Sequence, residues 1–562
     1  MAFMFAHRFV AISLLCFVTS ILAFAQPLTV EVNANMEIGE LTPVWQFFGY
    51  DEPNYTYMND GQKLLSELAS ANRGTVYIRT HNLLTSGDGT AALKWGSTNV
   101  YTEDVNGKPI YDFSILDRIF DTLIERRMKP LVELGFMPEA LSTNPAPYRH
   151  AWTPEPGAPS ISTGWAYPPK DYAKWGELVY QVARHCAERY GQREAESWLW
   201  EVWNEPNILY WRGTPEEYHR LYDFAADAVK RALPAARIGG PHSTGPGGES
   251  AAKFLRDFLK HAVRGKNYAT GETGAPLDFI AFHAKGRPKV VDAHVQMGSQ
   301  FQLRDIDSGF AIVASFPELR KLPIVIGESD PEGCAACGMR WHPQNGYRNG
   351  TMYASYTAAT FARKFELASL HGVNFLGAVT WAFEFEGQPY FDGFRDLSTN
   401  GVAKPVLDTF RMLGMMASQR IHARSDGALP LDTFLKDGVK AKPDINVLAS
   451  RGARRITILL WNYHDDDLPA KAASIELDLH ELEASRVMVE HYRVDEKHSN
   501  SYEVWRAMGS PQEPTEEQRL TLEASGDLAS LHSPQWKDTQ NGRMRLSFQL
   551  PRQAVSLLVL SW

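Results

Sequence analysis

Two acidic residues, Glu205 and Glu328, stand directly after short apolar runs of the sequence. Glu205 lies in the stretch WNEPN, and Glu328 lies in the stretch IVIGESD. Two facing carboxyl groups are what glycoside hydrolysis requires, because one protonates the leaving oxygen while the other acts on the opposite face of the sugar. Asn204, beside the first acid, can hydrogen-bond the sugar 2-hydroxyl as positive charge develops on the ring. These three residues form the candidate catalytic constellation.

A (β/α)8 (TIM) barrel would bring the two distant acids together. From about residue 41 to residue 416, short β-branched apolar runs alternate with longer amphipathic stretches, which is typical of βα units around a parallel sheet. The active site of such a barrel lies at the carboxyl ends of its strands. Glu205 and Glu328 close the fourth and seventh runs, which lie nearly opposite each other in an eight-membered ring. The predicted strands are residues 45–50, 75–79, 130–134, 198–203, 238–240, 279–282, 324–327 and 378–383.

The remaining patterns predict helices, a long loop and a second domain. Apolar residues at helical spacing predict helices over 112–127, 169–190, 215–233 and 350–371. The Pro-rich connection 143–169 is expected to shape the rim of the active site. After residue 416 the sequence alternates as in a β-sandwich, with no long helix, so we assign residues 26–420 to the catalytic barrel and 421–562 to the accessory domain. Residues 28–34 alternate similarly and are a candidate for joining the sandwich.

The sequence resembles glycoside hydrolase family 39 over nearly the whole mature chain. The stretches that carry the resemblance are RTH (79–81), VELGFMP (132–138), WNEPN (203–207), His283, 401–405, and HYRVD, HSN and Trp505 near the end. The resemblance implies a retaining enzyme with Glu205 as acid/base and Glu328 as nucleophile. It also implies that His81, Asn204 and His283 contact the sugar. On its own, a histidine at the end of a strand is equally often a structural residue.

Features near the second acid bear on which sugar is bound. Gly327 stands where the xylosidases of the family more often carry threonine. Lys285, with residues 270–272 upstream, looks more like the iduronidase branch, where a cation would meet a uronate carboxylate. Most of the barrel, including 165–175 and 204–207, resembles the xylosidases instead. We therefore expect an exo-acting β-xylosidase that releases terminal xylose, with α-L-iduronidase-like or arabinofuranoside activity as the alternative.

Three further side chains are candidates for substrate contact. They are Lys285, Trp381 in the eighth predicted strand, and Glu386 just beyond that strand. With a neutral pentose, Lys285 would hydrogen-bond hydroxyl groups or pair with a nearby acid such as Glu384 or Glu386.

Composition and the first residues restrict the class of protein. A chain of 562 residues is long enough for two domains, and its net charge of −9 without a basic stripe argues against nucleic acid. His7 and Arg8 precede the apolar run 9–22 and a small-residue site before Gln26, which predicts a cleavable signal peptide over residues 1–25. No later stretch could cross a bilayer, so we expect a secreted or periplasmic protein whose partner is an oligosaccharide or glycoside. The sequence does not predict an oligomeric state.

The cysteines leave one question open. Signal cleavage would leave Cys186, Cys334 and Cys337, of which the last two form a CxxC motif after Glu328. This motif is either a local disulfide or two packed thiols. A zinc site would need two further ligands, and only His342 is close in sequence, so neither a metal nor a cofactor is expected.

Two other classes of barrel protein fit the sequence less well. A non-catalytic carbohydrate-binding barrel is expected to lose one of the two carboxylates, and this chain has both. An aldolase would need a Schiff-base lysine at a strand end, for which Lys285 is the candidate, and a metal-dependent hydrolase would need a His/Asp cluster.

Overall fold

The computed structural model describes residues 27–91, 96–150 and 161–562. Eight parallel strands close into a barrel, and their order around the ring follows their order in the chain. The (β/α)8 barrel and all eight of its predicted strands are therefore confirmed. The barrel strands are β2 (Phe47–Tyr50), β3 (Tyr77–Thr80), β6 (Lys129–Leu134), β9 (Leu199–Val202), β10 (Arg237–Ser243), β11 (Phe279–Lys285), β14 (Pro323–Asp330) and β15 (Asn374–Trp381).

Barrel strands such as β14 begin with a continuous apolar run. In β14, for example, Ile324, Val325 and Ile326 are all fully buried. Such continuous apolar runs are typical of parallel strands covered on both sides. In β14, polar residues appear only where the strand reaches the mouth of the barrel, at Glu328, Ser329 and Asp330.

Helices between the strands cover the outside of the barrel. The four predicted helices are confirmed as α2 (Ser114–Glu125), α3 (Tyr172–Tyr190), α5 (Pro215–Ala232) and α8 (Thr351–His371). α5 shows why such a helix begins where it does. The Thr214 hydroxyl accepts from the N–H of Glu217 (3.1 Å), and the Glu217 carboxylate accepts from the N–H of Thr214 (2.7 Å). The helices of this part are α1 (Asn59–Ala71), α2 (Ser114–Glu125), α3 (Tyr172–Tyr190), α4 (Gln192–Glu196), α5 (Pro215–Ala232), α6 (Glu249–Arg264), α7 (Ser299–Ala314), α8 (Thr351–His371) and α9 (Pro405–Gly414).

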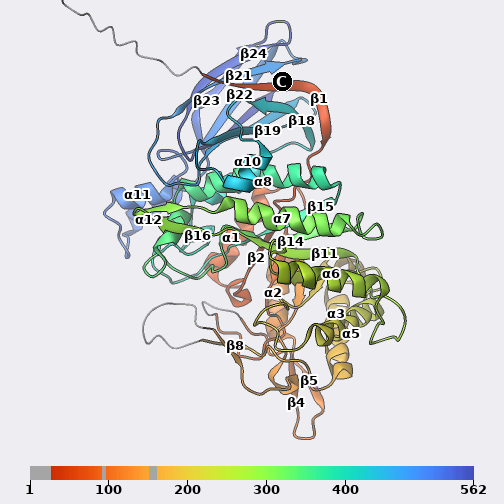
Figure 1. Cartoon of the computed structure of the whole chain (residues 1–562). Helices are drawn as coiled ribbons and strands as arrows, with labels where there is room; N and C mark the ends of the chain where they lie inside the picture. Colours follow the sequence, from red (N-terminus) through yellow and green to blue (C-terminus); the bar gives the residue numbers. More distant parts are fainter. Residues whose placement is uncertain (1–26, 92–95, 151–160) are drawn as a thin grey trace, which may run out of the picture.

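The predicted accessory β-domain is a single nine-stranded sheet curled around its own apolar core. The sheet packs on α8 (Figure 1). There Arg363 donates to the buried carboxylate of Asp444 (2.8 Å). In sheet order the strands are β23 (Ala529–Asp538), β22 (Arg486–Val494), β25 (Val555–Ser561), β20 (Arg455–Tyr463), β19 (Asp444–Gly452), β18 (Gln419–Ser425), β1 (Leu28–Glu40), β21 (Ala473–His480) and β24 (Met544–Leu550).

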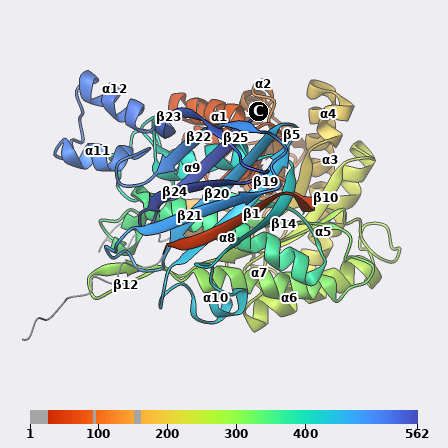
Figure 2. The same cartoon turned by 90° about the horizontal axis from the view of Figure 1, so that it is seen from above.

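The first described strand, β1, belongs to this sheet and not to the barrel. It pairs antiparallel with β18 and parallel with β21, and Figure 2 shows it beside β21 across the face of the sheet. Val30 and Val32 are fully buried in the core of the sheet. The two ends of the chain therefore build one domain together.

The second part also contains helices that the sequence pattern did not predict. They are α10 (Leu431–Asp437), α11 (Ser501–Ala507) and α12 (Glu516–Ser525). The expectation of no long helix is wrong for α12, because this helix buries only Leu522 and so lacks an apolar stripe that could reveal it. Leu522 packs with Phe391, Val402 and Trp505 in a small apolar cluster.

Short ribbons and turns complete the described chain. In the described part of the loop 143–169, β7 pairs with β8. No helix in the described ranges is long and apolar enough to span a bilayer. The expected signal peptide lies outside the described residues. The ribbons and 3-10 turns are β4 (Tyr101–Glu103), β5 (Pro109–Tyr111), β7 (Tyr148–His150), β8 (Ile161–Gly164), β12 (Lys289–Val291), β13 (His294–Gln296), β16 (Ser398–Thr399), β17 (Val402–Ala403), η1 (Pro53–Tyr55), η2 (Glu139–Leu141) and η3 (Pro343–Asn349).

Candidate active site

Glu205 and Glu328 meet at the mouth of the barrel, as their strand positions predict. One carboxylate oxygen of each and a ring nitrogen of His283 all lie within 4.8 Å of one another. The Glu205 side chain is 12% exposed and the Glu328 side chain 8%. A ligand in the cavity above them can therefore reach both carboxyl groups.

The chain that carries Glu205 leaves β9 in a backbone conformation that L-residues rarely adopt. The φ angles are 71° at Trp203 and 43° at Glu205. Such residues cost on the order of 1–3 kcal/mol and persist only where the surroundings impose them. Here the N–H of Trp203 donates to the carbonyl of Leu134 (3.1 Å), and that of Glu205 to the carbonyl of His242 (3.0 Å). Neighbouring strands thus hold the turn that presents Glu205 to the cavity.

Arg79, on β3, joins the acids beneath the cavity into one network. Its guanidinium donates to Glu201 Oε1 (2.6 Å) and Glu328 Oε1 (3.0 Å). It also reaches Glu133 Oε2 (2.9 Å) and Asn204 Oδ1 (3.0 Å). The planar guanidinium, with five N–H donors, suits such a set of acceptors. Arg79 therefore fixes the position of Glu328 relative to Asn204.

Glu328 is held in its anionic form. Lys285 Nζ lies 2.6 Å from Glu328 Oε2 and 2.5 Å from Asp330 Oδ2. Burial alone would raise the pKa of Glu328, but Lys285, His283 and Arg79 outweigh burial and bring this pKa well below the ordinary value. Burial would likewise lower the pKa of Lys285, yet its two carboxylate partners raise it.

Glu205 has a different partner. His283 is fully buried, and its Nδ1 lies 2.9 Å from Glu205 Oε1 and 3.7 Å from Glu328 Oε1. Among the interactions found in the described ranges, Glu205 pairs with this imidazole and not with a lysine or arginine. It also faces the cavity, where it can exchange a proton with a bound ligand.

Sequence analysis assigned no role to three buried titratable residues in or beside this network, Glu201, Glu133 and His242. Burial raises the pKa of Glu201 to about 7, and that of Glu133 well above its usual range, in both cases against the lowering effect of Arg79. Burial lowers the pKa of His242, which contacts Glu201, well below its usual range. None of the three lines the cavity. Glu133 and Glu201 contact Arg79, and Glu133 Oε2 also lies 3.4 Å from Nε2 of the cavity residue His81. The one feature of the sequence that could have pointed to these three is that each is a polar residue inside a barrel strand.

The cavity above the acids has a volume of about 340 Å³. His81 and Trp381 meet edge to face in its wall, with ring centroids 5.1 Å apart. Asp51 Oδ1 contacts both rings, at 3.0 Å from His81 Nδ1 and 3.2 Å from Trp381 Nε1. A ring wall flanked by polar groups suits a sugar, which has both apolar faces and hydroxyl groups. The cavity is lined by Asp51, His81, Asn204, Glu205, Tyr210, Lys285, Glu328, Gly333, Cys334 and Trp381.

Most of the substrate-contact residues predicted from the sequence meet at this cavity. His81, Asn204, Lys285 and Trp381 line it, and His283 lies against both acids. Sequence analysis missed Asp51 and Tyr210. Asp51 directly follows the first barrel strand, so the strand-end criterion could have found it. Tyr210 lies on a loop, where no such criterion applies.

The expected acid partners of Lys285 are wrong, and Glu386 lies elsewhere. Lys285 pairs with Glu328 and Asp330, because the register of β11 and β14 places Lys285 opposite Asp330. Glu384 is fully buried, and Glu386 Oε2 accepts from the backbone N–H at position 60 (3.1 Å). Glu386 does not line the described cavity.

The CxxC motif forms a disulfide between Cys334 and Cys337, which decides between the two alternatives. Cys186 is a free, buried cysteine on α3.

The two acids and His283 could together offer three ligand atoms to a metal ion. However, Arg79 and Lys285 already contact Glu328 at 3.0 and 2.6 Å. These two permanent cations would repel a metal cation, so the donor set fits an organic ligand better.

The chain is similar to known proteins in both sequence and structure. A β-xylosidase of Caldicellulosiruptor saccharolyticus is 26% identical over 539 residues, covering 94% of this chain and 98% of that protein. An α-L-iduronidase of Canis lupus familiaris is 25% identical over 574 residues, covering 95% and 78%. The crystal structure of a monomeric β-xylosidase from Caulobacter crescentus CB15 superposes with a TM-score of 0.74 at 20% identity, covering 95% and 99%. The family model described as glycosyl hydrolases family 39 matches residues 28–535, so the chain belongs to this family.

Proposed function

We propose that the protein is a retaining exo-glycosidase in which Glu328 is the nucleophile and Glu205 the acid/base. The observation that supports this most strongly is the approach of their carboxylate oxygens to within 4.8 Å. Retaining enzymes hold the two carboxyl groups about 5–5.5 Å apart, whereas inverting enzymes keep about 6.5–9.5 Å for a water molecule.

In the first step, Glu328 attacks the anomeric carbon while Glu205 donates its proton to the departing oxygen. The C–O bond of the glycoside breaks, and an ester forms between the sugar and Glu328. In the second step, Glu205 takes a proton from water, which attacks the anomeric carbon and releases Glu328 as a carboxylate. Arg79 and Lys285, which contact Glu328, stabilise the carboxylate that leaves.

The cavity favours a neutral terminal sugar, and we propose β-xylosides as the substrate. Its volume of about 340 Å³ is near the lower end of small-molecule sites and suits one sugar ring better than a polymer. Among the residues that line the cavity, three have carboxyl groups (Asp51, Glu205 and Glu328) and one, Lys285, has an ammonium group. This excess of acids disfavours a negatively charged sugar. Because Lys285 already has two carboxylate partners, the carboxylate of a uronate would have to compete with both.

One observation favours a second candidate, an α-L-iduronide. Lys285 lines the cavity, and a charge-assisted bond from it to a uronate would contribute about 1.5–3 kcal/mol. The relatives with about 25% identity include iduronidases as well as xylosidases.

Parallel assays separate these substrates. We expect kcat/KM for an aryl β-xyloside to exceed that for an aryl α-L-iduronide or an aryl α-L-arabinofuranoside. The opposite order for the iduronide, with a collapse of its turnover in Lys285→Ala, would overturn the xyloside assignment.

We also propose that the protein acts outside the cytoplasm, after removal of residues 1–25. The disulfide supports this, because such bonds persist mainly in oxidising compartments. Intact-mass measurement of protein from its native host should give a chain that begins at Gln26, and a chain that begins at Met1 would contradict the proposal.

A further inference from the structure

The loop after β14 brings the disulfide to the wall of the catalytic cavity. Gly333 and Cys334 line the cavity and follow the nucleophile Glu328 closely in sequence. Cys334 is half-buried at this wall, whereas Cys337 is only 3% exposed. The wall and the nucleophile therefore share one short segment of chain.

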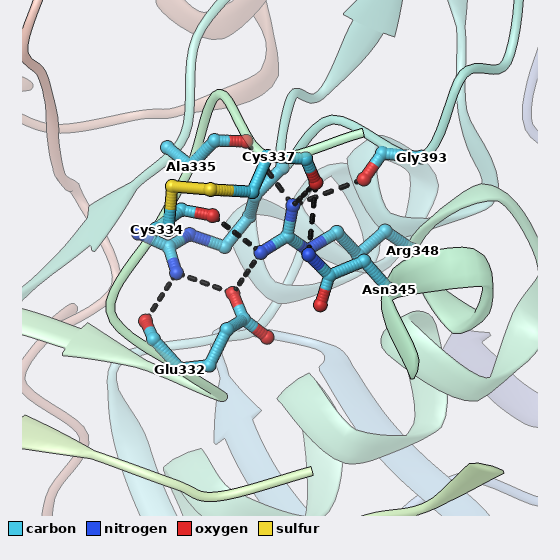
Figure 3. The surroundings of a disulfide bond; sticks show 8 residues. Glu332, Cys334, Ala335, Cys337, Asn345, Arg348 and Gly393 are labelled. Atoms are coloured by element: carbon cyan, nitrogen blue, oxygen red, sulfur yellow. Dashed lines mark hydrogen bonds and ion pairs between the residues drawn. A yellow bond between two sulfur atoms is a disulfide. The ribbon is translucent and has the colours of Figure 1, made fainter. Parts of the chain in front are cut away.

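One buried arginine, Arg348, holds this loop by hydrogen bonds to its backbone carbonyl groups. Arg348 is fully buried, and Figure 3 shows its guanidinium between the disulfide and Glu332. The two terminal nitrogens of Arg348 donate five hydrogen bonds, three from Nη1 and two from Nη2. The acceptors are the carbonyl oxygens of Cys334 (2.6 Å), Ala335 (3.1 Å), Cys337 (3.2 Å) and Gly393 (2.9 Å), and Glu332 Oε1 (2.6 Å).

A second arginine connects the loop to the residues around the nucleophile. The backbone N–H of Arg395 donates to the carbonyl of Ala335 (2.9 Å), and its side chain contacts Glu332. Arg395 Nη2 also lies 3.5 Å from Asp330 Oδ2, which in turn holds Lys285. A displacement of the loop would therefore move the cavity wall and disturb the ion pairs of Asp330 and Lys285 beside Glu328.

The disulfide has little to contribute to global stability. Stabilisation by a disulfide grows with the length of the loop that it closes, and here the two cysteines are only three positions apart. Its effect is local, on a segment without helix or strand, where backbone conformations are otherwise many.

We infer that the Cys334–Cys337 disulfide is a positioning element that, together with Arg348, fixes the cavity wall and so controls which sugar the cavity accepts. This inference rests on the proposed glycosidase function. The disulfide takes no part in bond making or breaking at the anomeric carbon. Opening it should weaken substrate binding and selectivity while leaving the chemical step nearly intact.

The test compares Cys334→Ser/Cys337→Ser with the control Cys186→Ala, which removes the buried cysteine and keeps the disulfide. For an aryl β-xyloside, we expect the double variant to show a KM raised roughly tenfold and a kcat changed less than about threefold. Its preference for the xyloside over the aryl β-glucoside, which carries an added hydroxymethyl group, should fall by about tenfold. Cys186→Ala should keep the wild-type values.

Reduction of the wild-type protein with dithiothreitol is the second arm, since it opens the bond and leaves both cysteines in place. It should reproduce the higher KM, and the double variant should not respond to the reductant. Hydrogen exchange of the backbone amides of residues 333–339 should rise in both cases. Unchanged exchange, or faster exchange without any change in KM or selectivity, would overturn the inference.

Failure of the proposed function gives a different result. In that case the oxidised wild-type protein would turn over none of the aryl glycosides, whereas the exchange measurement would still show whether the disulfide fixes the loop.

Discussion

The two sides of the catalytic cavity hold the same chemical group in different surroundings. On one side, Glu328 contacts Lys285 and Arg79, two permanent cations. On the other side, Glu205 contacts the imidazole of His283 and is somewhat more exposed. Cations stabilise a carboxylate that must attack and later leave, whereas a proton donor must be free to lose and regain its charge. The difference between the two environments thus supports the different roles proposed for two glutamates that lie within 4.8 Å.

Removal of the acid on the cationic side should have the largest effect. Glu328→Ala should lower kcat by on the order of 10⁴-fold or more, because no ester can form. Added azide should restore turnover and give a glycosyl azide of inverted configuration, which product analysis by NMR would identify. A variant that keeps wild-type activity would show that Glu328 is not the nucleophile.

Removal of the acid on the imidazole side should have a selective effect. Glu205→Ala should nearly eliminate hydrolysis of natural xylosides, with a loss of about 10²–10⁴-fold, since their leaving oxygen needs a proton. An aryl glycoside with a good leaving group should lose much less in its first step. Comparison of kcat/KM for the two substrate types checks this, and equal losses would remove Glu205 from the acid role.

Removal of the Lys285 ammonium should make the surroundings of Glu328 more like those of Glu205. In Lys285→Met, the pKa of Glu328 should rise from its depressed value toward the ordinary glutamate value of about 4.3. Activity needs the anion and is lost as pH falls through this pKa, so the acid limb of kcat/KM against pH should move to higher pH. Lys285→Arg keeps the charge and is the control. An acid limb that stays in place in Lys285→Met would contradict the pairing with Glu328.

A substitution far from both acids should change the stability of the protein and leave the surroundings of Glu205 and Glu328 unchanged. Leu460 is fully buried in the core of the nine-stranded sheet. Leu460→Ala should lower the free energy of unfolding by about 2–5 kcal/mol because it leaves a cavity. The kcat of the folded protein should not change, as measured by denaturation and by kinetics on the same sample. A changed pH profile would show that the sheet acts on the site.

The sequence predicted the barrel well because its strands are continuous apolar runs at regular intervals. It predicted the sheet less completely. β23 is largely exposed and has no apolar alternation, so nothing in its sequence distinguishes it from a loop. The pairing of β1 with β18 joins residues from distant parts of the chain, for example Val30 with Ser425, and such pairing depends on tertiary contacts that periodicity does not contain.

The site was predictable where function coincides with the end of a strand, as at Glu205, Glu328 and His81. The ion-pair partner of a charged residue was not predictable where the sequence offers several acids. From the sequence, Glu384 and Glu386 were the suggested partners of Lys285, whereas the register of β11 against β14 places it opposite Asp330. The convergence of buried acids on Arg79 likewise depends on three-dimensional packing.

The most direct test of the account is to trap the covalent intermediate with an activated 2-deoxy-2-fluoro-β-xyloside and to locate the label by peptide mass spectrometry. The account predicts one added fluorosugar per chain, attached to Glu328, with no label in Glu328→Ala. A label on Glu205 or on any other residue would contradict it, as would hydrolysis of the reagent with inversion and no label at all.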